Sequence, residues 1–412
     1  MKKICIALLH YSCPPVVGGV EEVVRQQASL FHRYYHPVKI FAGAGGQFTH
    51  EYRVEINPLL SSRNPRVLTY HQNSSEQINE LYAIADNIFQ YLKKALAEFD
   101  ILIAHNVLTM HYNLPLTYAL HQLAESEQIK VISWNHDSPY FYENPPVDLQ
   151  IKPWDILKSY NPKIYYIAIS EIRKKQFLQL YGEDKKIEVI PDGIDPIRFF
   201  RLDNTTVRII QENNLFEADF ILAQPCRLHP RKNIELSIRV TKALHDQGVK
   251  ACLLITGAYD PHEEKTVSYY LKLKELAESL GIGKEVLIMA EYLFESGEKY
   301  TPDRITIRDL YLISDLLFMP SKQEGFGIPL LEAGMIKLPI VCSDIPPFRE
   351  IGGEHVCYFS LQDPPEKIAA TIINFMESQS LYKMFHKVMR NYVWDSIYHR
   401  TLLPFLERVV KS

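Results

Sequence analysis

The sequence predicts an α/β protein made of two doubly wound domains, and three observations support this fold class. The chain has 412 residues, which is enough for two domains with substantial cores. Short apolar runs alternate with longer segments whose apolar residues recur at helical spacing. This alternation breaks after about residue 195 and then starts again. We therefore expect two Rossmann-like domains that face each other across a cleft, with ligands at the carboxyl ends of the strands.

The first domain is predicted to span residues 1–197. Six apolar runs in it are expected to form parallel strands, at 3–9, 38–42, 101–104, 131–134, 165–169 and 187–190. The first run superficially resembles a signal peptide, but its apolar part is too short and no small-residue cleavage site follows it. Between the second and third runs, Ser74-Ser75-Glu76-Gln77 resembles a capping box ahead of a helical pattern from Leu81 to Leu96.

The second domain is predicted to span residues 219–393. Residues 198–218 are polar and mixed, and we interpret them as a connector between the domains. Strands are expected at 220–223, 251–256, 286–290, 316–319, 339–342 and 357–359, with helices at 234–245, 271–280 and 367–376. The tail at 394–410 has the spacing of a last amphipathic helix. The halves share no sequence repeat, so their similarity is expected to be architectural only.

Composition and charge argue against several function classes. The formal net charge of −4 gives no basic footprint, so nucleic-acid binding is not expected. No apolar run approaches the roughly 18 to 20 residues needed to cross a bilayer. The six cysteines are scattered and lie mostly in apolar runs, which favours buried free thiols and a cytoplasmic protein. No Asp-x-Asp tripeptide and no cluster with metal-ligand spacing occurs, so we expect no required metal and no cofactor.

The stretch 320–334 carries the strongest functional pattern. It follows the apolar run 316–319, and its Gly325 and Gly327 permit a tight loop that a ligand can approach closely. Pro329 suits the first position of a helix. The order is therefore strand, glycine loop and helix N-terminus, which is an anion-binding arrangement, with Glu324 in the loop and Glu332 in the helix. An ordinary strand-to-helix turn with two solvated glutamates is the alternative.

Three other stretches follow predicted strands. Gly18-Gly19 could present backbone N–H groups to a phosphate, although a plain turn explains it nearly as well. His136 ends an apolar strand, where a hydrogen-bonded structural histidine is the commoner case. Arg227 and Lys232 lie five residues apart across a proline turn, so both side chains could reach one diphosphate. A solvated basic loop is the alternative there. A turn role is the better interpretation of Asp192 and Asp195.

Together these stretches resemble a known family. Glu324 and Glu332, in Glu-Gly-Phe-Gly-Ile-Pro-Leu-Leu-Glu-Ala, resemble the E-x7-E signature of the family-4 retaining glycosyltransferases, which have the GT-B fold. Further motifs stand where that family has them: Gly18-Gly19-Val20-Glu21, His136-Asp137, Val189-Ile190-Pro191-Asp192-Gly193-Ile194-Asp195, Arg227 with Lys232, and Ser343-Asp344-Ile345-Pro346-Pro347-Phe348-Arg349-Glu350. The resemblance spans nearly the whole chain and is dense in the second domain.

The resemblance implies a role for each motif in donor binding. Arg227 and Lys232 would hold the donor diphosphate as it leaves, and Glu332 would bind the ribose hydroxyls. Glu324 would contact the transferred sugar. The loop that follows Glu324 and the glycine turn of the first domain would complete the donor site; their residues are Gly18, Gly19, Gly325, Phe326, Gly327, Ile328 and Leu331.

The resemblance also implies a place for His136, against the sugar near its anomeric carbon or 6-hydroxyl, and for the helix at 394–412, packed back on the first domain. Residues 43–75 and 293–308 are polar and irregular and match no family motif. The first segment is expected to shape the acceptor site, and the second leaves the nucleotide base unassigned. Lys174-Lys175 and Lys185-Lys186 leave peripheral contact with anionic lipid open, although short basic runs are usually solvated.

The function implied by the resemblance is transfer of a hexose, glucose or mannose, with retention and without a metal. The donor would be a UDP-, GDP- or ADP-linked sugar, and the acceptor hydroxyl would belong to a small molecule, a glycan or a lipid-linked molecule. Alternatives are a nucleotide-sugar 2-epimerase, a sugar phosphorylase and a non-catalytic sugar-nucleotide-binding protein. A nicotinamide-dependent oxidoreductase is disfavoured because neither Gly18-Gly19 nor Gly43-Ala44-Gly45-Gly46 has the G-x-G-x-x-G spacing.

Overall fold

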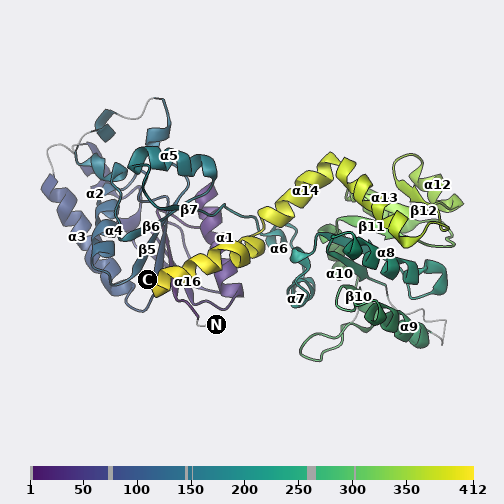
Figure 1. Cartoon of the computed structure of the whole chain (residues 1–412). Helices are drawn as coiled ribbons and strands as arrows, with labels where there is room; N and C mark the ends of the chain where they lie inside the picture. The colour runs from purple at the N-terminus through teal and green to yellow at the C-terminus, as the bar shows by residue number, and fades with distance from the viewer. Residues whose placement is uncertain (1–2, 73–77, 144–146, 151, 258–265, 301–302) are drawn as a thin grey trace. The chain divides into compact units, whose positions relative to one another are not determined.

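The chain forms two compact units (Figure 1). The computed structural model describes residues 3–72, 78–143, 147–150, 152–257, 266–300 and 303–412. Unit 1 consists of Met1–Ile194 together with Ile397–Ser412, and unit 2 of Asp195–Ser396. The expected capping box at 74–77 lies outside the described residues.

Unit 1 is built on a seven-stranded parallel sheet with the order β3-β2-β1-β4-β5-β6-β7. Its strands are β1 (Ile6–His10), β2 (Val38–Ala42), β3 (Arg53–Ile56), β4 (Ile101–His105), β5 (Lys130–Asn135), β6 (Ile164–Ala168) and β7 (Ile187–Val189). In the central register Leu8 of β1 pairs with Ile40 of β2 on one side and Ile103 of β4 on the other. Strands buried on both faces need continuous apolar runs, and this is why their positions were predictable.

The expectation that residues 43–75 are irregular is wrong. This segment contains the edge strand β3, the 3-10 helix Pro58–Leu60 and helix α2 (Pro65–Gln72). The strand has the sequence Arg-Val-Glu-Ile, and none of its residues is fully buried. Lys39 of β2 pairs with Glu55 of β3, so a cross-strand ion pair accompanies the backbone ladder. An edge strand with polar, half-exposed residues lacks the apolar run by which strands were recognised.

Helices connect the strands of unit 1 and carry its core. They are α1 (Gly19–Arg33), α2, α3 (Ile78–Ala95), α4 (Leu114–Glu125) and α5 (Glu171–Tyr181). Asn113 caps α4 by accepting a hydrogen bond from the Leu116 amide, and Ser170 caps α5 in the same way through Arg173. The apolar stripe of α3, including Ile84 and Ile88, packs in one cluster with Leu9 of β1.

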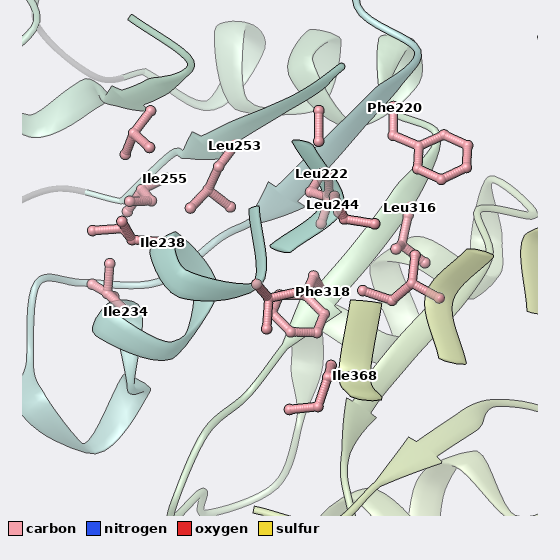
Figure 2. Packing of buried hydrophobic residues seen from close by; sticks show 14 of the residues in the cluster. Phe220, Leu222, Ile234, Ile238, Leu244, Leu253, Ile255, Leu316, Phe318 and Ile368 are labelled. Carbon is pink, nitrogen blue, oxygen red and sulfur yellow. The ribbon is translucent and has the colours of Figure 1, made fainter. Parts of the chain in front are cut away.

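Unit 2 repeats the same architecture with six parallel strands in the order β10-β9-β8-β11-β12-β13. They are β8 (Phe220–Gln224), β9 (Ala251–Ile255), β10 (Val286–Ile288), β11 (Leu316–Met319), β12 (Ile340–Ser343) and β13 (Cys357–Phe359). Leu222, Leu253 and Phe318 belong to the cluster on one face of this sheet (Figure 2). Their neighbours in sequence, such as Leu254 and Leu317, belong to clusters on the other face. The sheet is therefore covered on both sides, as the prediction of doubly wound Rossmann-like domains requires.

The helices of unit 2 begin within the segment interpreted as a connector. Residues 198–218 contain the last two residues of α6 (Pro196–Phe199), all of α7 (Asn204–Glu212) and the 3-10 helix Leu215–Glu217. Ile209 and Ile210 are buried in one cluster with Leu254 of β9, so this segment is part of the core of unit 2. The other helices of the unit are α8 (Ile234–Asp246), α9 (Thr266–Ser279), α10 (Arg304–Ile313), α11 (Ile328–Met335), α12 (Pro346–Gly352), α13 (Pro365–Ser378) and α14 (Ser380–Asn391).

The last residues of the chain pack on unit 1. The helical tail consists of α15 (Trp394–Ile397), a π-helical turn at Tyr398–Leu402 and α16 (Leu403–Lys411). The Tyr398 ring stacks on Tyr34 with 4.1 Å between ring centroids, and its hydroxyl lies 2.7 Å from Nε2 of His36. No described helix combines the length and apolar character required to cross a membrane.

Both sheets reverse their strand order at one place. In unit 1 the reversal lies between β1 and β4, and in unit 2 between β8 and β11. In doubly wound sheets the loops at the carboxyl ends of the two central strands diverge there, and they leave a crevice that commonly holds the ligand. The loops after these four strands are therefore where a functional site is expected.

Candidate active site

The reversal in unit 2 brings two oppositely charged side chains together. Lys232 follows β8 and Glu324 follows β11, and Nζ of Lys232 lies 2.5 Å from Oε1 of Glu324. Both side chains are about nine-tenths buried. Arg231 lies 3.2 Å from the second oxygen of Glu324, and the Ser321 hydroxyl donates to Oε1 at 2.8 Å. The glutamate is thus held by two cations and a hydroxyl, which satisfies a carboxylate with little access to water.

Backbone contacts fix the two loops to each other. The Lys322 amide donates to the Arg231 carbonyl at 2.8 Å, and the Asn233 side chain donates to the Pro320 carbonyl at 3.1 Å. Asn233 has a left-handed backbone, with φ of 54°, where asparagine is better tolerated than most residues. The pairing of Lys232 with Glu324 is therefore supported by a network and is more than a chance surface contact.

The loop after Glu324 leads into helix α11. Gly327 has φ of 122°, which favours glycine, and a Cβ at this position would lie 3.2 Å from the Phe348 ring. Gly325 faces open space, and Phe326 and Ile328 are more than half exposed. Pro329 is the second residue of α11, one position later than predicted, where its missing N–H still costs nothing. The loop therefore presents backbone and apolar side chains to solvent beside a helix N-terminus.

Two cavities adjoin these residues. One, of about 470 Å³, is lined by Arg231, Lys322, Gln323, Glu324, Gly325 and residues 345–347. The other, of about 600 Å³, has Arg227 and Glu332 in its wall, together with Arg304, Arg308, Thr256 and Tyr311. In each cavity the basic side chains outnumber the carboxylates, so each favours an anionic ligand. Leu331 instead lines a larger and mainly apolar cavity of about 960 Å³.

Tyr311 orients the second glutamate of the motif. Its hydroxyl donates to Oε2 of Glu332 at 2.8 Å, and burial together with this carboxylate raises the pKa of Tyr311. The phenol therefore stays protonated and acts as a donor. Burial also raises the pKa of Cys226, in the same wall, to about 12, so its thiol is not a nucleophile at neutral pH.

Sequence reasoning gave no role to Tyr311, Arg231, Arg304 or Arg308. Arg231 could have been predicted from the sequence, because it is next to Lys232 in the basic loop. Tyr311 left no signal, since it lies 21 residues before Glu332 on another helix. Of the other predicted site residues of unit 2, Glu324 and Gly325 line one polar cavity, and Arg227 and Glu332 line the other. Lys232 contacts Glu324, whereas Phe326, Gly327 and Ile328 line neither cavity. Their roles in binding and catalysis stay predictions.

The reversal in unit 1 gathers histidines. Nδ1 of His136 lies 3.0 Å from Oδ2 of Asp192, and its Nε2 lies 3.3 Å from Nδ1 of His105. The His136 amide donates to the Asn106 side chain at 3.1 Å. The interpretation of Asp192 as a turn residue is wrong, because its carboxylate binds His136 and Trp134. Asp195 caps α6 through the Ile197 and Arg198 amides, as a turn residue does.

Gly18 and Gly19 stand at the start of α1 on the same edge of the sheet. Gly18 is the N-cap residue with extended backbone, and a Cβ there would meet only the movable Glu21 side chain. Gly19 is the first helical residue, and a Cβ on it would meet nothing. Packing within unit 1 therefore does not demand glycine at position 19, and the expected contact of its amide with a diphosphate stays a prediction.

Within the described part of the chain, no group of three or more His, Cys, Asp or Glu side chains is placed to hold a metal ion. The expectation that no metal is required remains a prediction.

Comparison with known families assigns both units. Residues 206–392 match the model described as glycosyl transferases group 1, and residues 17–198 match the model described as Glycosyltransferase Family 4. The chain belongs to these glycosyltransferases. Each match covers most of one unit, so together the two matches include both sheets and both groups of candidate residues. The resemblance drawn from the motifs is confirmed.

The relatives of this glycosyltransferase include sugar-transferring synthases. It is 25% identical to the mannosylglucosylglycerate synthase of Petrotoga mobilis over 84% of its length, which covers 83% of that protein. It is 27% identical to the mannosylfructose-phosphate synthase of Agrobacterium fabrum over 58% of its length, which covers 54% of that protein. A solved glycosyltransferase from Rickettsia africae ESF-5 aligns over the whole of both chains at 19% identity and a TM-score of 0.38, too low to support an argument.

Proposed function

We propose that this glycosyltransferase moves a hexose from a nucleoside-diphosphate sugar to an acceptor hydroxyl, with retention at the anomeric carbon and without a metal. The observation that carries the proposal is the excess of basic side chains in two cavities at the strand reversal of unit 2. Arg227, Arg231 and Lys232 lie within one stretch of six residues in the segment that follows β8. A nucleoside diphosphate carries at least two negative charges, which these side chains can neutralise without a metal ion.

Each charged residue has a distinct part in donor binding under this proposal. Arg227 and Lys232 bind the diphosphate, Arg227 with its planar guanidinium and Lys232 with a compact ammonium. Glu332, which Tyr311 holds in place, accepts hydrogen bonds from the ribose hydroxyls. The loop at 325–328 contacts the phosphates through its amides, and Glu324 faces the sugar. Lys232 has three N–H donors, so it can keep Glu324 as a partner while it binds a phosphate oxygen.

The chemistry of the transfer step explains why cations are needed. The bond between the anomeric carbon and the phosphate oxygen breaks, and its electron pair leaves with the diphosphate. Negative charge grows on the leaving group while positive charge grows on the sugar. One fixed donor aimed at such developing charge is typically worth about 3–4 kcal/mol. The acceptor oxygen then bonds to the anomeric carbon from the face that the diphosphate left, and the acceptor proton passes to a diphosphate oxygen.

Mannose is the hexose we favour, with glucose as the second choice. The named relatives from Petrotoga mobilis and Agrobacterium fabrum are both mannosyl synthases. The proposed donor is therefore a nucleoside diphosphate of mannose or glucose. Unit 1 supplies His136, and the backbone N–H of Gly19, as the groups that contact the sugar and the diphosphate.

A thermal-shift panel tests the donor class. UDP-, GDP- and ADP-linked mannose and glucose are each added to the full chain, with the free sugars and with inorganic phosphate as controls. A ligand at 100 times its Kd stabilises the native state by about 2.7 kcal/mol. We expect one nucleotide to raise the melting temperature clearly and the free sugars to have no effect. If no sugar nucleotide raises it at millimolar concentration, the donor class is wrong.

The same panel tests the proposed independence of metal. The change in melting temperature caused by the donor, and the rate of sugar transfer from that donor to an acceptor, are measured again in the presence of EDTA. Both are expected to remain within experimental error, because Arg227 and Lys232 supply the positive charge. A loss of transfer that Mg²⁺ or Mn²⁺ restores would overturn this part of the proposal.

A further inference from the structure

His136 is held at both ends of its ring. Nδ1 faces Asp192 at 3.0 Å and Nε2 faces His105 at 3.3 Å. Only about a tenth of its side chain is exposed. A ring held at both nitrogens has a fixed orientation, and its proton distribution is decided by its two neighbours.

Asp192 is itself held in a fixed geometry. The indole Nε1 of Trp134 donates to Oδ1 of Asp192 at 3.1 Å, and Oδ2 is the oxygen that faces His136. Trp134 is fully buried on β5. The indole N–H can only donate, so one oxygen of the aspartate is committed to it. The other oxygen is an acceptor, which favours a proton on Nδ1 of His136.

His105 closes the other end of the arrangement. It is fully buried, and burial lowers its pKa well below the usual histidine value, so it is neutral at pH 7. Its Nε2 lies 3.1 Å from the terminal amide of Gln27, whose nitrogen has no other partner among the described residues. With this NH₂ group turned to donate to Nε2 of His105, the His105 proton lies on Nδ1 and is donated to Nε2 of His136. His10 is also neutral, since burial lowers its pKa to about 4, and its Nδ1 donates to the His105 carbonyl at 2.7 Å.

The remaining charged groups near His136 are directed to other partners. Glu21 of α1 accepts from Ser12 and lies 3.9 Å from His10. Asp137 pairs with Arg173 of α5 at 3.1 Å and accepts from Tyr142. Among the described contacts, the carboxylate bound to the His136 ring is therefore that of Asp192. The sequence motif that contains Asp192 gave no indication that its carboxylate binds a histidine.

We propose that Asp192 is a positioning residue for glycosyl transfer, which holds His136 in one orientation with the proton on Nδ1. The proposal rests on the proposed function for its effect on turnover, but its structural part stands apart from any substrate. Asp192 acts through His136 and is not assigned a contact with the sugar. Trp134 determines which way the carboxylate, or an amide in its place, must face.

Asp192→Asn is the decisive substitution because Trp134 constrains the new amide. Its oxygen must accept from the indole, which leaves the NH₂ group facing Nδ1 of His136. Nδ1 then has to accept, and the proton moves to Nε2. The double variant Asp192→Asn with Trp134→Phe removes this constraint, so the amide can rotate and present its oxygen to Nδ1. We expect the single variant to invert the tautomer and the double variant to restore it.

The measurement is the ¹⁵N spectrum of the histidine rings in the full chain, which reports the nitrogen that carries the proton. The His136 signals are assigned by their loss in His136→Asn. The wild type and Trp134→Phe are expected to show the Nδ1–H form, and Asp192→Asn the Nε2–H form. An unchanged tautomer in Asp192→Asn, with a folded spectrum, would overturn the proposal whether or not the donor is known.

Turnover gives the second test. A misoriented group commonly costs about 100-fold in rate, so kcat of Asp192→Asn is expected to fall by about that factor. The KM for the donor is expected to change by less than about threefold, because Asp192 does not bind it. Asp195→Asn is the matched control, since Asp195 caps α6 through the Ile197 and Arg198 amides and asparagine also caps helices. A normal kcat with an inverted tautomer would show that the ring orientation does not matter for transfer.

Discussion

The two units have the same strand order around the reversal, yet the loops at that place carry opposite kinds of chemistry. In unit 2 the loops after β8 and β11 hold permanent charges, with Lys232 and Arg231 around Glu324. In unit 1 His10 and His105 are the last residues of β1 and β4, and His136 directly follows β5, all in mainly buried positions. The shared fold therefore supplies a place for a site, and the loop residues decide what that place can bind.

The comparison also separates the two units by how their buried groups are stabilised. The Lys232–Glu324 pair keeps both charges because each neutralises the other and Ser321 adds a hydrogen bond. Among the described residues, no fully charged side chain lies within hydrogen-bonding distance of His10 or His105, with Glu21 3.9 Å from His10, and burial lowers the pKa of both histidines. Unit 2 thus holds paired charges at its strand reversal, while in unit 1 burial keeps His10 and His105 neutral at pH 7.

The largest effect is expected from removing the charge in unit 2. Lys232→Ala should lower kcat by about 10² to 10³, because the leaving diphosphate loses one fixed donor. Lys232→Arg should retain part of the rate, since it keeps the charge but changes the geometry. Transfer kinetics with the donor found in the thermal-shift panel measure this. Lys242→Ala, which breaks an exposed pair with Asp246 on α8, is the control. Turnover within threefold of the wild type would contradict the role of Lys232.

The second effect is the pH dependence of the free energy of unfolding. Between about pH 4 and 7, His10 makes this free energy rise with pH in unit 1, whereas Asp315 makes it fall with pH in unit 2. His10 has a native pKa of about 4 against an unfolded value near 6.5, so the unfolded chain binds more protons between these values. Its contribution is complete above pH 6.5 and is lost as the pH falls towards 4. In unit 2, burial raises the pKa of Asp315 to about 7, so there the native state binds more protons. That contribution is present near pH 4 and is lost as the pH rises to 7.

Tryptophan placement allows each unit to be followed in the full chain. Trp394→Phe leaves Trp134 and Trp154 as reporters of unit 1, and replacing those two by Phe leaves Trp394 in unit 2. Urea unfolding is measured between pH 4.5 and 7.5. His10→Asn should reduce the loss of unit 1 stability on acidification, by up to roughly 3 kcal/mol. Asp315→Asn should become more stable relative to its parent as the pH rises. If the free energy of unfolding changes with pH equally in a variant and its parent, the substituted residue is not the source of the pH dependence.

The smallest effect is expected from the support of Glu332. Tyr311→Phe removes one hydrogen bond to this carboxylate, worth about 1 kcal/mol, so the Kd of the donor should rise about fivefold. The kcat should be unchanged, because the ribose does not react. Tyr269→Phe removes a similar bond, from the Tyr269 hydroxyl to Glu235 at 2.7 Å, and serves as the control. If Tyr311→Phe and Tyr269→Phe bind the donor with equal affinity, Glu332 does not take part in donor binding.

The sequence was most informative where strands are buried on both faces. The strand at 316–319 is buried throughout and has the predicted bounds, because a continuous apolar run identifies it. The strands at 38–42 and 357–359 also have the predicted bounds, although they are only partly buried. It was least informative at the edge strand β3, where charged Arg53 and Glu55 alternate with Val54 and Ile56 and no residue is fully buried. It also mistook the helical start of unit 2 for a connector, because α7 buries only one face and its other side chains are polar.

The motifs of the sequence by themselves determined the family and the positions of Glu324, Glu332, Arg227, Lys232 and His136 on loops and helix ends. Only the tertiary structure decided which of these residues meet. Lys232 and Glu324 are 92 residues apart, and His136 and Asp192 are 56 apart. The segments that carry them become neighbours only when the strand order places β8 beside β11, and places β5 and β7 on either side of β6. Local patterns determine strands and turns, whereas side-chain partners depend on which strands the fold makes adjacent.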